Sequence, residues 1–248
     1  MIPIRSLILA TAALCAAGAL PAGEKAEYTD QFPLRSCSFA STGGNAYFPL
    51  QPERVTYFHN QRCVAAGECD ELEELWITVT EQTRTLSVPV GTQRLRVAAR
   101  VVQERELADG ELKEISRNYL ASCLPNRDVY YFGEEVDIYE EGEVVSHAGQ
   151  WLAGSHGALP GIIMPDSAFI VGSRYYQELA PGIALDRAEH VETGLEITVP
   201  AGTFRNCVRV VETSPLEPGH QSMKAYCPGV GMVLDNELEL AAVYTEDD

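Results

Sequence analysis

Apolar residues alternate with polar ones along much of the chain, and this two-residue period constrains the fold more than any other feature. It is clear over residues 75–79, 95–101 and 195–199, where Leu, Ile, Val or Ala occupies every second position. Successive side chains of a β-strand point to opposite faces, so the pattern predicts half-buried strands. No stretch after residue 22 holds a helical period of comparable length.

The breaks between these segments have the composition of tight turns. Asp109-Gly110 and Glu141-Gly142 each separate two strand-like runs, and Pro200-Ala201-Gly202 separates two more. Gly accepts a positive φ without strain, which hairpin turns between antiparallel strands require. About a dozen short strands joined in this way predict an all-β fold, an antiparallel up-and-down barrel or strongly curved sheet, with little helix apart from the leader.

The chain divides into a leader, an irregular segment and one domain. Residues 1–22 are predicted to be a signal peptide, with Arg5 at its positive end, an apolar run over residues 7–17 and small residues at a cleavage site. Residues 23–51 are expected to be irregular, and residues 52–248 to form a single antiparallel β domain. No other segment reaches the roughly 18 apolar residues of a membrane span. The sequence predicts an exported protein, periplasmic or extracellular, without a transmembrane anchor.

The charge balance argues against one class of partner. The chain has 36 acidic residues against 18 basic ones, a formal net charge of −18. Phosphate backbones would be repelled, so no nucleic-acid partner is expected. The sequence also has no motif that would bind a cofactor, and none is predicted.

Six cysteines follow the leader, an even number that indicates disulfides in an exported chain. Six cysteines allow 15 pairings, so local geometry must choose among them. Two of the cysteines are equidistant from the turn residue Glu217, and a hairpin centred there brings them together. Two others can close a short loop, which leaves the last two for each other. A thiolate metal site is the alternative, but the sequence has no CxxC spacing and no nearby histidine, so no metal is predicted. The expected pairs are Cys207 with Cys227, Cys63 with Cys69, and Cys37 with Cys123.

The segment 149–165 is the main candidate for a binding element. It is rich in Gly, Ala and Pro and is 17 residues long, which is long for a barrel connection. We expect it to be a loop that covers one end of the barrel, with Trp151, Met164, Tyr175 and Tyr176 lining an apolar pocket for a small apolar ligand. The alternative is that the segment belongs to the core.

Other candidate sites have weaker patterns. Ser155, His156 and Asp166 have the residue types of a hydrolase triad but lack the GxSxG context. Glu134 and Glu178 have the residue type of a glycosidase pair, as many pairs do in so acidic a chain. An acidic cluster around the second hairpin has oxygens suited to calcium. Strand alternation divides that cluster between two faces, which favours a solvated edge. The cluster comprises Glu134, Glu135, Asp137, Glu140, Glu141 and Glu143.

Several short motifs resemble those of a known group. The chain contains YFGEEVDIY, WLAG, PGIIMP, VPAGTF, PLEPG and PGVG. With these motifs it resembles a group of exported bacterial proteins of unknown function, over roughly residues 45–244. The resemblance implies a secreted β-rich domain and no catalytic set.

Two classes of function are expected on this basis. The first is a non-catalytic binding or envelope-associated protein, with an apolar small molecule or an envelope component as partner. The second is an extracytoplasmic hydrolase with carboxylate or Ser/His residues. Carboxylates or a Ser/His pair converging within hydrogen-bond reach in a concave site would favour the hydrolase, whereas an apolar interior or a filled core would favour the first class.

Overall fold

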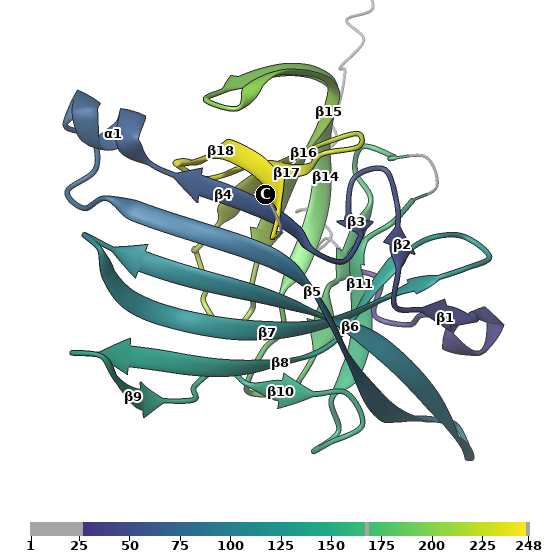
Figure 1. The fold of residues 1–248 in the computed structure, drawn as a ribbon. Helices are drawn as coiled ribbons and strands as arrows, with labels where there is room; N and C mark the ends of the chain where they lie inside the picture. Colours follow the sequence, from purple (N-terminus) through teal and green to yellow (C-terminus); the bar gives the residue numbers. More distant parts are fainter. Residues whose placement is uncertain (1–26, 167–168, 247–248) are drawn as a thin grey trace, which may run out of the picture.

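The chain folds almost entirely into β-strands (Figure 1). The structure, a computed structural model, describes residues 27–166 and 169–246. The predicted leader lies outside the described residues. Among the described residues, one short α-helix, α1 (Gln61–Ala66), and one 3-10 turn, η1 (Leu34–Ser36), accompany the strands. The predicted all-β class is confirmed.

The strands run up and down in sequence order around a nearly closed antiparallel sheet. The first of them, β4, lies between β5 and the last strand, β18, so the end of the chain returns to its start. The strands of this sheet, in chain order, are β4 (Arg54–His59), β5 (Glu73–Val90), β6 (Gln93–Ala108), β7 (Glu111–Cys123), β8 (Val129–Glu140), β11 (Leu159–Met164), β12 (Arg174–Tyr176), β13 (Glu178–Leu179), β14 (Arg187–Val199), β15 (Gly202–Thr213), β16 (Ser222–Cys227), β17 (Gly231–Asp235) and β18 (Leu238–Thr245).

One extended segment joins the two edges of the sheet. Its first half, β12, pairs with β14, and its second half, β13, pairs with β11. The two halves are separated by Gln177 alone. The sheet therefore closes on itself through this segment, as expected for an up-and-down barrel.

We expect Gly161→Ala to lower the free energy of unfolding by about 1–3 kcal/mol. A Cβ at Gly161 would lie 2.3 Å from the carbonyl oxygen of Tyr176 and 2.5 Å from that of Gln177, so a methyl group would push the closing segment away from β11. Urea denaturation measures the change. Leu159→Ala, on the same strand with its side chain 41% exposed, is the control and should cost about 0.5 kcal/mol. If the Gly161→Ala variant were as stable as the wild type, the close packing of β11 against the closing segment would be contradicted.

Residues 149–165 do not form the loop predicted from the sequence. They contain β10 (Trp151–Leu152) and β11, and both strands pair with β8. The expectation of an unstructured lid is wrong, because the backbone groups of this segment are taken up by the sheet. The remaining short strands are β1 (Phe39–Ala40), β2 (Gly43–Gly44), β3 (Pro49–Leu50) and β9 (Glu143–Ser146).

One end of the barrel is occupied by residues 45–50 from the irregular N-terminal segment. Leu50 is completely buried and packs in a cluster with Val79, Val102 and Leu120. The side chain of Asn45, itself buried, donates hydrogen bonds to two backbone carbonyls, and its Oδ1 accepts bonds from two N–H groups of its own turn. Because these contacts satisfy the polar groups of the turn, the segment can act as a plug.

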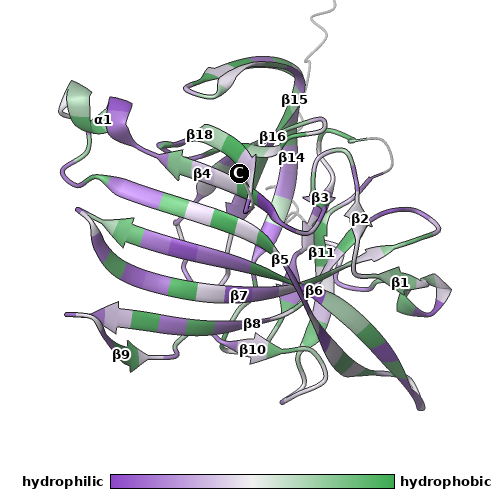
Figure 2. Ribbon diagram, in the orientation of Figure 1, coloured by the Kyte–Doolittle hydropathy of each residue, from purple (hydrophilic) through white to green (hydrophobic). Residues whose placement is uncertain are grey.

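Strands β6, β7 and β8 are buried on both faces, and the alternating hydropathy along the strands is visible in Figure 2. On one face Val102 and Leu120 pack with the plug. On the other face Tyr119, Tyr130 and Phe132 belong to a separate core. Phe39 of the N-terminal segment covers that second face, with its ring 5.3 Å from that of Tyr130. The sheet is therefore sandwiched between the barrel interior and an outer layer.

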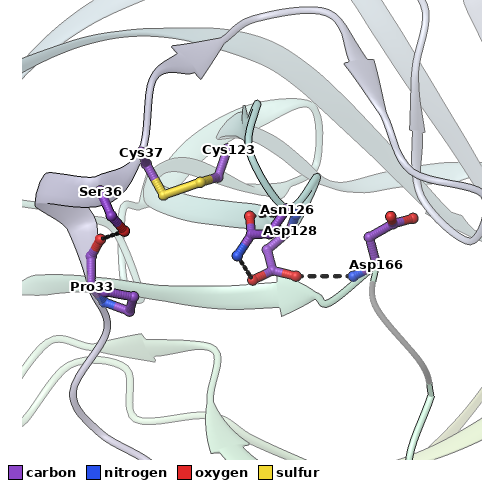
Figure 3. The surroundings of a disulfide bond; sticks show 7 residues. All are labelled: Pro33, Ser36, Cys37, Cys123, Asn126, Asp128 and Asp166. Carbon is purple, nitrogen blue, oxygen red and sulfur yellow. Dashed lines mark hydrogen bonds between the residues drawn. A yellow bond between two sulfur atoms is a disulfide. The ribbon is translucent and has the colours of Figure 1, made fainter.

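Three disulfides tie the chain together, with the pairing expected from the sequence. They join Cys37 to Cys123, Cys63 to Cys69, and Cys207 to Cys227. The first attaches the N-terminal segment to the end of β7 (Figure 3). Structural disulfides persist in oxidising surroundings, so the chain is extracytoplasmic. Within the described ranges, no helix is long and apolar enough to cross a membrane.

Candidate functional site

The barrel contains a cavity of about 250 Å³ that is partly open to solvent. Its wall takes residues from strands all around the sheet, from β4 to β8 and from β15 to β17, and from the plug. Part of the wall is apolar, with Ile77, Val79, Val102, Leu120, Ile163 and Met232. The rest carries a concentration of charge. The carboxyl groups are those of Glu104, Glu134, Glu178, Asp186, Glu212 and Asp235, and the cations are Arg54 and Lys224.

Lys224 organises one side of the cavity. Its ammonium lies 3.0 Å from Glu212 Oε2 and 3.4 Å from Asp235 Oδ2, and all three side chains are at least three-quarters buried. Burial alone lowers the pKa of Lys224, but the two carboxylates outweigh it and hold the pKa well above its ordinary value. Gln177 Nε2 and Ser222 Oγ donate further hydrogen bonds to the same two carboxylates. This side is therefore a satisfied ion-pair network.

The other carboxyl groups of the cavity have no ion pair among the described residues. Burial raises the pKa of Glu104 to about 8, and the neighbouring carboxylates of Glu106 and Glu134 add to the effect against the opposing pull of Lys224. Burial, together with Glu114, raises the pKa of Glu134 to about 7. Burial, followed by Asp186, raises the pKa of Glu178 well above its ordinary value. These raised pKa values favour the protonated carboxyl, which can act as both donor and acceptor.

A bend in β8 brings Glu134 and Trp151 to the cavity. Gly133 has φ +149°, and a Cβ there would lie 2.7 Å from the Trp151 carbonyl oxygen, so the close approach of β10 depends on this glycine. The β7–β8 register also shifts between Asn118 and Leu120. The result is that Tyr131, Glu134 and Trp151 line the same cavity, with the Tyr131 and Trp151 rings edge to face at 5.2 Å.

Of the four pocket residues expected from the sequence, one lines this cavity. Trp151 does so, and its side chain is 4% exposed. Met164 and Tyr175 pack together in a separate core cluster. The Tyr175 hydroxyl lies 2.9 Å from His190 Nε2, where burial lowers the pKa of the imidazole to about 4. Tyr176 is half-buried beside Tyr28, with ring centroids 6.1 Å apart. The structure thus separates Trp151 from the other three.

The residues of the hydrolase pattern do not all interact. Ser155 Oγ and His156 Nδ1 are 2.9 Å apart and exposed, at a second cavity of about 340 Å³ that shares Glu134 and Trp151 with the first. Asp166 instead forms an ion pair with Arg127, and its N–H donates to the carboxylate of Asp128 (Figure 3). The acid of the proposed triad therefore has a different partner.

The acidic residues of the second hairpin are divided between two faces, as the strand alternation predicted. Glu135 is bound by Arg84 and by the Tyr119 hydroxyl. Asp137 is bound by Arg117 and lies 3.1 Å from His147. Across the part of the chain that the structure describes, no group of three or more His, Cys, Asp and Glu residues is placed to hold a metal ion.

Most of the charged wall was not predicted from the sequence, although one signal for it was present. In β6, Val102 and Glu104 are two positions apart and face the same cavity. A charged residue two positions from a buried residue of the same strand lies on the same face, so it indicates a polar site in the interior. The same signal applies to Lys224, two positions before the buried Tyr226 in β16.

Comparisons with known proteins give little further information. No family model matches the chain, and no curated protein matches it. A crystal structure described as "a putative lipoprotein from Parabacteroides distasonis" matches with a TM-score of 0.33 and 13% identity. The match covers 81% of this chain and 99% of that one. A likeness this weak carries no argument about fold or function.

Proposed function

We propose that this chain is an exported, non-catalytic binding protein that holds a small molecule inside its barrel. The observation that carries the proposal is the cavity of about 250 Å³, whose wall combines apolar side chains with carboxyl groups that have no ion-pair partner among the described residues. Buried carboxyl groups are normally paired with cations, so a partly buried cavity wall with carboxyl groups that form no ion pair favours a bound ligand. The charged wall favours a polar ligand over the wholly apolar one expected from the sequence.

The hydrolase alternative has two observations in its favour. Ser155 and His156 are in contact at the second cavity but lack an acid partner, because Asp166 pairs with Arg127. Glu134 and Glu178 line the first cavity together. Glycoside hydrolysis needs two carboxyl groups with pKa values pushed apart, one protonated and one ionised. Here burial raises the pKa of both groups. Two other carboxylates of the wall, Glu212 and Asp235, already form ion pairs with the ammonium of Lys224. This arrangement supports binding over catalysis.

We expect Val102→Phe to abolish binding while the barrel still folds. Val102 is 1% exposed and lines the cavity, so the larger ring would occupy the ligand's space. Native mass spectrometry of protein purified from its own host without denaturation should show a small molecule on the wild type and none on the variant. Val144→Phe on the exposed strand β9 is the matched control and should keep the ligand. A wild-type protein that carries no small molecule would contradict the proposal.

A further inference from the structure

The cavity wall contains more carboxyl groups than cations. Six carboxyl side chains face two basic ones. Lys224 is taken up by Glu212 and Asp235. The Arg54 guanidinium donates to the backbone carbonyl of Val230 and forms no ion pair with any residue that the structure describes. The carboxyl groups left without an ion pair among the residues that the structure describes are therefore those of Glu104, Glu134, Glu178 and Asp186. Glu104 and Glu134 interact with each other, and Lys224 attracts Glu104 without forming an ion pair with it.

A second, independent feature of the wall is an unsatisfied donor. Trp151 is only 4% exposed, and its Nε1–H has no acceptor within the described part of the chain. A buried donor without an acceptor is destabilising. Because Trp151 lines the cavity, a ligand oxygen is the natural acceptor. The wall therefore lacks two things, a cation beside the carboxyl groups and an acceptor beside the indole.

We propose that the ligand is a small organic cation that carries an ammonium group and an oxygen acceptor, such as an amino alcohol or an amino sugar. The ammonium lies between Glu104 and Glu134, and the oxygen accepts from Trp151 Nε1. This inference rests on the proposed function. When the ammonium binds, the two carboxyl groups release their protons to solvent, and the carboxylates so formed pair with it. Tyr131 and Tyr226, in the same wall, are aromatic side chains of the kind that attract cations.

An organic cation fits this wall better than a bare metal ion. Much of the wall is apolar, with Ile77, Val79 and Val102 on one side, and a single ion would leave that surface uncovered. A carbon skeleton between the ammonium and the oxygen would cover it. The same apolar side chains limit the ligand to one that fits about 250 Å³.

Titration calorimetry on the full mature protein at pH 7.5 tests the inference with matched probes. Glucosamine is compared with glucose, and ethanolamine with ethylene glycol, so each pair differs in its ammonium group. We expect the amine of at least one pair to bind at least tenfold more tightly than its neutral partner. Glu104→Gln should weaken that binding at least fivefold, and Trp151→Phe, which keeps the ring and removes the donor, should weaken it by a smaller factor. Glu140→Gln, an exposed residue at the end of β8, should leave it unchanged.

The outcomes separate this inference from the proposed function. If the amine and its neutral partner bind equally, the inference of a cationic ligand is wrong. The proposed binding cavity still holds in that case if Val102→Phe abolishes the binding of both probes. Amine binding that survives Val102→Phe would place the site outside the barrel and overturn both proposals. No heat from either amine would overturn the inference. Displacement of the amine by millimolar calcium chloride, with a calcium affinity above that of the amine, would overturn it in favour of a metal ion.

Discussion

Loss of the Cys37–Cys123 disulfide is expected to lower the free energy of unfolding by about 4–5 kcal/mol. The bond links residues 86 positions apart, so its removal frees a long loop in the unfolded chain. It also releases the N-terminal segment, which covers the outer face of β6–β8 and supplies the plug at residues 45–50. Urea denaturation of the Cys37→Ala/Cys123→Ala protein measures the loss.

The Cys63–Cys69 bond provides the matched control for this prediction. It closes a loop with a separation of 6 residues beside α1, so the same chain-entropy argument gives about 2–3 kcal/mol for its removal. The two double variants have the same change in composition and differ in loop length and in what the bond holds. Equal losses of stability would contradict the role assigned to the N-terminal segment.

Glu104→Gln is expected to stabilise the unliganded protein by about 2–4 kcal/mol at pH 8. Burial raises the pKa of Glu104 to about 8 from an ordinary value of 4.5, so the folded state holds its proton more tightly than the unfolded state. The stability from this group is fully present below pH 4.5 and is lost as the pH rises towards and through 8. Glutamine does not titrate, so the variant loses nothing over this range.

The pH dependence of the difference is the informative measurement. At pH 5 the wild type and the variant should agree within about 1 kcal/mol, and the gap should widen steadily up to pH 8. His190, with its pKa lowered to about 4 by burial, destabilises the fold as the pH falls below 6.5, but it does so equally in both proteins and cancels. The surface variant Glu140→Gln should show no such widening. Parallel stability curves for wild type and Glu104→Gln would contradict a buried carboxyl at this position.

The turns and strands of the barrel could be predicted because they depend on local chemistry. Asp109-Gly110 and Glu141-Gly142 have positive φ at both positions, 49° and 80° in the first and 51° and 82° in the second, as a two-residue hairpin turn requires. The pairing of β11 with β13, which closes the sheet, could not be predicted in the same way. It is set by contacts with strands distant in sequence.

The candidate site was harder to predict, because a two-residue period shows which side chains share a face but not which face is the interior. Val101 and Val102 lie on opposite faces of β6, and both are buried. The register also shifts within β5–β6, between Val79 and Thr83, and within β7–β8. Each shift changes the phase of the pattern. The cavity forms only where Glu104, Lys224 and Trp151 meet across the closed barrel, and no local spacing encodes that meeting.

The carbon NMR titration of glutamate side-chain carboxyls in the unliganded protein tests the central claim most directly. The claim is that side chains from distant strands form one acidic cavity inside the barrel. We predict that Glu104 titrates with a pKa of about 8 and Glu134 with a pKa of about 7, assigned through the Gln variants. Both groups titrating near 4.5, like exposed glutamates, would contradict the acidic cavity and the binding site built on it.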